Sequence, residues 1–152
     1  EAALRTAYFT LKGENPPADA FRAVRSEGFQ ENAGIQEAEF MIGDIKLRTA
    51  AVSGLGNTRR LLQQIERGEV HYDLVEVMAC PGGCVGGGGQ PIHDGEERAF
   101  TRGRKLYALD AKAKLRYSHE NPDIREIYSD FFGKPMSHKA HMLLHTEHWK
   151  NN

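Results

Sequence analysis

The chain has 152 residues, 39% of them hydrophobic, which is enough for one hydrophobic core. Twenty basic and 21 acidic residues leave a formal net charge of −1, so the composition excludes the strongly basic surface typical of proteins that bind nucleic acid or an anionic membrane. The sequence has no run of about 18 apolar residues and no signal-peptide pattern, so we expect a cytoplasmic protein that binds neither nucleic acid nor membrane.

The N-terminal third of the sequence predicts two helices followed by a β-hairpin. The first helix should end near Gly13, because the Asn-Pro-Pro at 15–17 cannot continue it, and a short second helix covers 18–25. Hydrophobic and polar residues then alternate from 35 to 52, with Gly43-Asp44 placed as a two-residue hairpin turn. We therefore expect two antiparallel strands here.

A strand–helix–strand unit is predicted next. Asn57 or Thr58 should cap a helix that ends at Gly68. The apolar face of this helix consists of Leu61, Leu62 and Ile65. Residues 72–78 then predict a buried strand, and a right-handed crossover would place it parallel to the second strand of the hairpin.

The C-terminal third predicts three more helices. The first covers 101–117, after a charged stretch, 96–105, that we interpret as a solvated face. The residues of this helix expected to point inward are Leu106, Leu109 and Ala113. Asn121 should cap a second helix that ends at Gly133, and a third covers 137–148.

These elements together predict an α/β fold with one domain over residues 1–152. We expect a small, mainly parallel sheet with a β-hairpin and flanking helices, plus a C-terminal helical arm.

The segment 80–91 carries the clearest chemical signal. It holds Cys80 and Cys84, the only two cysteines, and six of the 16 glycines lie between positions 82 and 89. The cysteines follow the end of a predicted strand, where ligands bind in open α/β sheets. Thiolates are soft ligands for iron–sulfur clusters and zinc, and glycines let the backbone approach a bulky group closely. The segment is therefore predicted to be a metal or cluster site.

The sequence supports other metal sites or a nucleotide site less well. Three residues separate the cysteines, unlike the two of thioredoxin-type or zinc-knuckle motifs, which disfavours a zinc site completed by His93. Gly54 and Gly56 lack the third glycine of a dinucleotide-binding motif. Four histidines at spacings of 3, 4 and 3 could share one helix face, but we expect a structural role for them. They are His138, His141, His145 and His148.

The cysteine loop resembles the third cluster-binding signature of the iron-only (FeFe) hydrogenases, Glu-x-Met-x-Cys-x-x-Gly-Cys-x-x-Gly-Gly-Gly-Gln-Pro. The matching residues are Glu76, Met78, Cys80, Gly83, Cys84, Gly87, Gly88, Gly89, Gln90 and Pro91. Further blocks between 104 and 145 resemble the C-terminal, small-subunit-like segment of the same family. We therefore expect residues 1–91 to correspond to a large-subunit lobe and 92–152 to a small-subunit-like helical segment.

This resemblance implies a hydrogenase that converts protons and hydrogen at an H-cluster, a 4Fe-4S cubane linked to a two-iron subsite. By motif position, Cys80 would ligate the cubane, Cys84 would bridge it to the two-iron subsite, and Met78 would pack close to that subsite. The residues expected to shape the surrounding shell are Gly82, Gly83, Gly87, Gly88, Gly89 and Gln90.

The chain has two of the four cysteine ligands that the family's H-cluster takes. We therefore interpret it as the C-terminal half of a catalytic domain, either excised from a longer protein or encoded as one piece of a split enzyme, and inactive alone. Its implied partners are the upstream half of that domain and an electron carrier such as ferredoxin or another hydrogenase subunit. A non-catalytic relative, either an iron–sulfur assembly factor or a hydrogen sensor, is the alternative.

Overall fold

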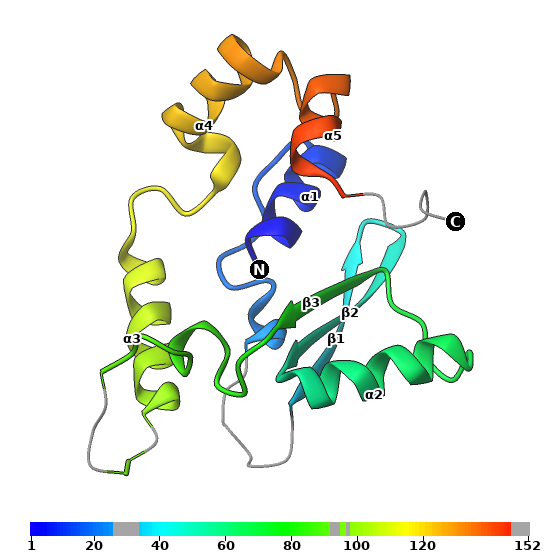
Figure 1. Cartoon of the computed structure of the whole chain (residues 1–152). Helices are drawn as coiled ribbons and strands as arrows, with labels where there is room; N and C mark the ends of the chain where they lie inside the picture. Colours follow the sequence, from blue (N-terminus) through cyan, green and yellow to red (C-terminus); the bar gives the residue numbers. More distant parts are fainter. Residues whose placement is uncertain (26–33, 92–94, 97, 147–152) are drawn as a thin grey trace. The chain divides into compact units, whose positions relative to one another are not determined.

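The computed structural model describes residues 1–25, 34–91, 95–96 and 98–146, so His93 and His148 lie outside the described residues. The chain divides into two compact units, Glu1–Ala113 and Lys114–Asn152. The first holds the sheet and the cysteine loop, and the second holds short helices (Figure 1). The predicted division into segments 1–91 and 92–152 stays a prediction.

Three strands form the sheet of the first unit, in the order β1-β2-β3. Strands β1 (Ile35–Ile42) and β2 (Ile45–Ser53) are antiparallel, and β3 (Leu74–Met78) runs parallel to β2. The turn between β1 and β2 uses Gly43 at a φ of 61°, a conformation that glycine adopts without steric cost. The predicted hairpin, the parallel crossover and the α/β class are confirmed.

Helix α2 (Leu55–Glu66) connects β2 to β3 and begins earlier than the sequence predicts. Its N-cap is Gly54, at a φ of 87°, and neither Asn57 nor Thr58 caps it. The Asn57 amide instead donates a hydrogen bond to the Ser53 carbonyl at 2.7 Å, one turn back. The predicted cap was wrong because a glycine with positive φ allows the chain to turn directly from β2 into the helix.

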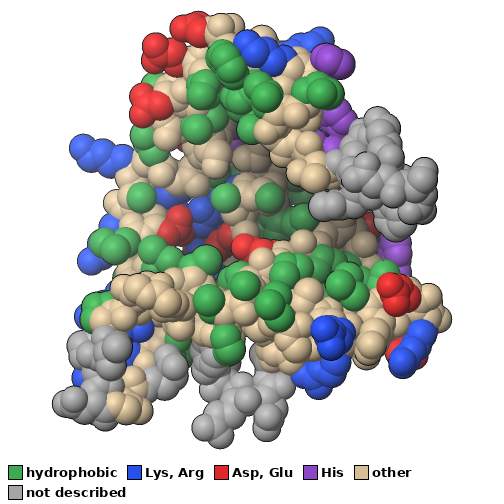
Figure 2. All heavy atoms as spheres, in the orientation of Figure 1, with side chains coloured by type: hydrophobic (Ala, Val, Ile, Leu, Met, Phe, Trp, Pro, Cys, Tyr) green, Lys and Arg blue, Asp and Glu red, His purple; other side chains and the backbone are tan. Residues whose placement is uncertain are grey.

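The hydrophobic core of the first unit has two parts. Ala50, Val52 and Leu61 are at most 2% exposed and pack between β2 and α2. The other part is formed by Leu4, Phe21 and Ile42. Strand β3 is not buried as predicted, because it lies at the edge of the described sheet. Figure 2 shows hydrophobic side chains along the outer face of β3 and α2, and the exposed ones there are Leu55, Leu62, Ile65, Leu74 and Val77.

Two predicted helices of the first unit are shorter than expected. Helix α1 (Ala2–Lys12) ends at Gly13 as predicted, but the segment 18–25 contains only the 3-10 turn η1 (Arg22–Val24). Helix α3 (Ala99–Lys112) ends before Ala113, which has an extended ψ of 137°. Leu106 and Leu109 are 53% and 66% exposed, so the predicted inward face of this helix was wrong. The sequence has no glycine or proline near 113 to signal the end.

The second unit begins with the 3-10 turn η3 (Ser118–Glu120). The Asn121 side chain then caps α4 (Pro122–Ile127) by accepting the Asp123 N–H at 3.0 Å, as predicted. The predicted single helix continues as a π-helical turn, η4 (Tyr128–Phe132), where the Ser129 hydroxyl donates to the Glu126 carbonyl and competes with the regular ladder. Helix α5 (His138–Leu144) is capped by Ser137 and ends four residues earlier than predicted. No helix of the described residues is long and apolar enough to span a membrane.

Candidate functional site

The cysteine loop begins where β3 ends. The Gly54 N–H donates to the Met78 carbonyl at 2.8 Å, which fixes the end of β3 against the start of α2. The loop then turns back, because the Gly83 N–H donates to the Cys80 carbonyl at 2.9 Å and opens the 3-10 turn η2 (Gly83–Val85). These bonds bring both cysteines of the predicted site beside the carboxyl end of a parallel strand pair.

The sulfur atoms of the loop lie against glycines. Both cysteines are free thiols; Cys80 is half-buried and Cys84 is exposed. A Cβ atom added at Gly87 would lie 2.9 Å from the Cys80 Sγ, and one added at Gly83 would lie 2.9 Å from the Met78 Sδ. Because real Cβ atoms do not approach sulfur this closely, the two glycines leave space that the sulfur atoms use. In the structure, Cys80 thus packs against Gly87, and Met78 packs against Gly83.

Other glycines of the loop have different surroundings. Gly82 and Gly86 pack backbone against backbone, since a Cβ on Gly82 would lie 2.6 Å from the Gly86 Cα. Both also lie against the buried Ala99 at the start of α3. By contrast, Cβ atoms at Gly88 and Gly89 would meet no atom within 4 Å. The predicted shell residues therefore differ in how closely other atoms pack against them: Gly82, Gly83 and Gly87 are tightly packed, whereas Gly88 and Gly89 are not.

Gln90 closes the loop on itself. Its side-chain amide donates to the Cys84 carbonyl at 3.4 Å, and its backbone N–H donates to the Gly87 carbonyl at 3.4 Å. The side chain of Gln90, a predicted shell residue, is therefore hydrogen-bonded to the main-chain carbonyl of one of the two cysteines.

A cavity of about 240 Å³ lies beside the loop. Met78, Gly83 and Cys84 line it from the strand and the loop, together with Glu76. Arg25 contributes from the segment that follows η1. The lining of the cavity therefore includes two sulfur-containing residues, Met78 and Cys84, together with charged residues.

An ionic cluster of two arginines and two acidic residues lies beside this cavity. Arg25, 9% exposed, bonds the Glu1 carboxylate at 2.6 Å, and Arg5, 7% exposed, bonds Asp110 at 2.9 Å. The hydrogen bond to Glu1 raises the pKa of Arg25, although burial acts in the opposite direction. Its guanidinium also lies 4.7 Å from the centre of the Tyr107 ring. Sequence reasoning missed this cluster, because its members are far apart in the chain and no local pattern marks them.

The donor set of the loop fits a cluster only in part. Two thiols and one thioether are soft donors, suited to iron and sulfur, and glycines give them room. No group of three or more His, Cys, Asp or Glu side chains that could hold a metal ion exists within the described part of the chain. Of the predicted histidine stripe, His141 and His145 stack with ring centres 4.7 Å apart. The described residues can thus provide part of a cluster site.

Comparisons with known proteins agree with this donor chemistry. Residues 1–88 match the family model described as iron only hydrogenase large subunit, C-terminal domain, and residues 96–151 match the one described as iron hydrogenase small subunit. The chain is 48% identical to the NADP-reducing hydrogenase subunit HndD of Solidesulfovibrio fructosivorans over 99% of its own length and 25% of that protein. It is also 32% identical to the cytosolic iron-sulfur assembly component 3 of Mus musculus, over 97% of its own length and 30% of that protein.

The fold is similar to that of a solved FeFe-hydrogenase from Chlamydomonas reinhardtii. The TM-score is 0.72 with 37% sequence identity, and the match covers 96% of this chain and 42% of that one. The chain therefore spans less than half the length of each of these relatives. The family models, the sequence relatives and the structural neighbour agree, and this chain belongs to the iron-only hydrogenase family as a C-terminal region of it.

Proposed function

We propose that this chain provides the C-terminal half of an iron-only hydrogenase catalytic domain, which oxidises hydrogen reversibly to protons and electrons. The observation that carries the proposal is the loop after β3, where two free thiols and the Met78 thioether lie with close glycines beside a cavity. The chain supplies two of the four cysteine ligands, and the partner is the remainder of the catalytic domain, on the same or another chain.

Each side chain of the loop has a distinct role in this proposal. Cys80 and Cys84 would hold the H-cluster through their sulfur atoms, Cys80 as a ligand of the cubane and Cys84 as the ligand nearest the two-iron subsite. The bound H-cluster supplies the redox chemistry and the hydrogen-splitting chemistry. Met78 contributes an uncharged thioether, which excludes water without offering a proton. Gly82, Gly83, Gly87, Gly88, Gly89 and Gln90 shape the backbone around these sulfur atoms.

Two non-catalytic functions are the alternatives. The similarity to an assembly component over nearly the whole chain supports an iron–sulfur assembly factor. The motif favours the enzyme, because it retains Met78 and the complete Gly-Gly-Gly-Gln-Pro stretch, and the identity to a hydrogenase subunit is higher. A hydrogen sensor shares the same motif, so hydrogen turnover is the property that separates it from the enzyme.

The test is to produce the chain together with the missing portion of the HndD catalytic domain and the family's maturation factors. We expect infrared bands of iron-bound carbonyl and cyanide, and hydrogen evolution from a reduced viologen. The control is the double variant Cys80→Ala, Cys84→Ala, which should show neither. A 4Fe-4S signal without these infrared bands would favour the assembly factor, and the infrared bands without turnover would favour the sensor.

A further inference from the structure

One face of helix α3 lies against the cysteine loop. Ala99, Arg102, Gly103 and Leu106 stand at i, i+3, i+4 and i+7, which places them on the same side of the helix. Ala99 is 1% exposed beneath Gly82 and Gly86, and a Cβ on Gly103 would lie 3.9 Å from the Val85 side chain. The middle of this face is occupied by a charged side chain.

That side chain, Arg102, bonds the loop at two points. Its Nη1 donates to the Val85 carbonyl at 3.2 Å, and its Nη2 donates to the Pro91 carbonyl at 2.7 Å. Val85 directly follows Cys84, and Pro91 directly follows Gln90. The two hydrogen bonds therefore bracket the four consecutive glycines 86–89 from both ends.

The guanidinium is chemically suited to this task. Its donors lie in a rigid plane, so one side chain can hold two carbonyls at a fixed separation, and hydrogen bonds from a charged donor are stronger than neutral ones. Few main-chain hydrogen bonds restrain the glycine run: the Gly86 N–H donates to the Gly83 carbonyl at 3.2 Å, and the Gln90 N–H donates to the Gly87 carbonyl at 3.4 Å. Arg102 thus adds restraint where the backbone has the most conformational freedom.

We propose that Arg102 is a positioning residue, which fixes the loop around Cys84 before a cluster binds. The inference rests on the proposed function for its purpose, and on the two hydrogen bonds for its geometry. Arg102 lies in the segment that matches the small-subunit model, and Val85 lies in the segment that matches the large-subunit model. The small-subunit-like segment therefore takes part in building the cluster site.

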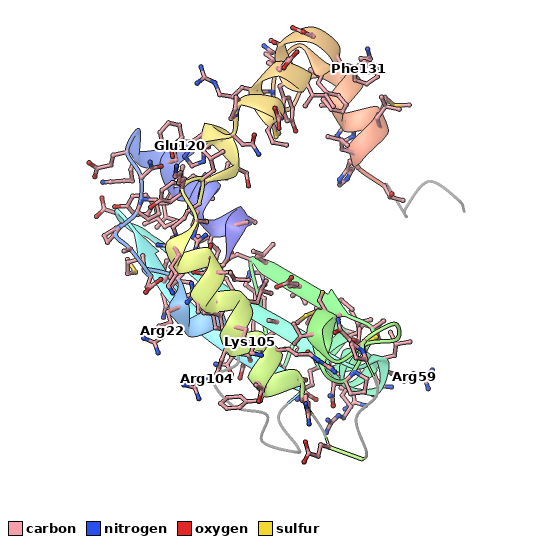
Figure 3. All side chains as sticks on the ribbon, turned by 90° about the vertical axis from the view of Figure 1, so that its left-hand side faces the viewer. Arg22, Arg59, Arg104, Lys105, Glu120 and Phe131 are labelled. Carbon is pink, nitrogen blue, oxygen red and sulfur yellow. The ribbon has the colours of Figure 1, made fainter. Side chains whose placement is uncertain are left out.

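The test compares Arg102→Ala, Arg102→Lys and the matched control Arg104→Ala in the metal-free 152-residue chain. Arg104 is an exposed arginine on the same helix, and its guanidinium stacks on Phe100 and extends away from the loop (Figure 3). The measurement is amide hydrogen exchange of peptides covering 83–91, with a peptide covering 45–53 as reference for the folded sheet.

We expect loop exchange to become about tenfold faster in Arg102→Ala, because a charge-assisted hydrogen bond is lost at each end of the run. Arg102→Lys should restore protection only in part, since an ammonium cannot span both carbonyls as the guanidinium plane does. The sheet peptide should not change, and Arg104→Ala should behave like the unaltered chain. Unchanged loop exchange in Arg102→Ala would overturn the proposal, and so would an equal rise in the sheet peptide.

A second readout uses the assembled, cluster-loaded protein. We expect Arg102→Ala to shift the reduction potential of the cubane, because a looser loop changes the hydrogen bonding and solvent exposure of the ligand sulfurs. Arg104→Ala should leave the potential unchanged, and an unchanged potential in Arg102→Ala would contradict the positioning role. If the unaltered chain never acquires a cluster, the proposed function fails, whereas the exchange experiment on the metal-free chain still decides the role of Arg102.

Discussion

Strand β2 and the cysteine loop belong to the same unit but obtain their order from different sources. Strand β2 has a neighbouring strand on each side, and its Val52 is completely buried against α2. The loop has no buried apolar side chain of its own. Close glycine contacts, three main-chain bonds within 80–90, the Gln90 side-chain bond to Cys84 and the two bonds from Arg102 order it. The sheet is therefore held by its own neighbouring strands and helix, whereas the site depends in part on a side chain from another segment.

The largest expected effect concerns the chain alone. Because the loop offers only two thiolates, the isolated chain should evolve no hydrogen from a reduced viologen, even when it is produced with the family's maturation factors. The control is the Cys80→Ala, Cys84→Ala double variant, and the two proteins should give the same background rate. Turnover above that background would show that the loop is a self-contained site that needs no groups from another segment.

Removal of one sulfur from the assembled protein should have the next largest effect. In our assignment Cys84 is the sulfur that joins the two-iron subsite to the protein, so Cys84→Ser should lose that subsite together with its activity. Infrared bands of iron-bound carbonyl and cyanide are the readout, and electron paramagnetic resonance of the 4Fe-4S cubane shows whether the rest of the site remains. An unaltered infrared spectrum would contradict the ligand assignment.

Two neighbouring leucines of α2 test the contribution of the hydrophobic core to stability. Leu61 is 1% exposed and Leu62 is 52% exposed, so they form a matched pair. Leu61→Ala should lower the free energy of unfolding by about 2–5 kcal/mol through lost burial and a residual cavity. Leu62→Ala should change it by about 0.5 kcal/mol or less. Chemical denaturation monitored by circular dichroism measures both, and equal losses would mean that the core is not where we place it.

The smallest expected effect concerns the close packing of Gly87 against Cys80 in the loop. A Cβ at Gly87 would lie 2.9 Å from the Cys80 Sγ, whereas one at Gly56 in α2 has nothing within 4 Å. Gly87→Ala should therefore cost about 1–3 kcal/mol of local overpacking and reduce the fraction of assembled protein that carries a cluster. Gly56→Ala is the control and should keep full occupancy, measured as iron per protein. Equal occupancy in the two variants would show that Cys80 moves freely in the loop.

The sequence predicts best those features that depend on neighbouring residues. The hairpin is predicted correctly because the turn at Gly43-Asp44 and the alternation around it act locally. The cap at Asn121 is correct for the same reason. The start of α2 is predicted wrongly, because Asn57 resembles a cap residue and the conformation of Gly54 cannot be read from its identity.

Features that depend on distant contacts escape the sequence. The stretch 96–105 was expected to be a solvated face, yet Arg102 within it bonds carbonyls 17 and 11 residues away. The ion pair between Glu1 and the buried Arg25 has the same origin, since residues 24 positions apart meet only after folding. The position of the cysteines at a strand end was accessible from the sequence, but the contribution of Glu1, Arg25 and α3 to the cavity beside them was not.

The glycine run also has a consequence for protein engineering. At Gly82 and Gly86 the main chain itself excludes a side chain, and at Gly83 and Gly87 a sulfur atom does so. Gly88 is different, since it has open space around it and is not among the glycines with positive φ. Alanine there restricts the unfolded chain without strain in the folded one, a change that can add about 0.4–1 kcal/mol of stability. Of the six glycines in this loop, Gly88 is thus the position at which alanine is expected to stabilise the metal-free chain.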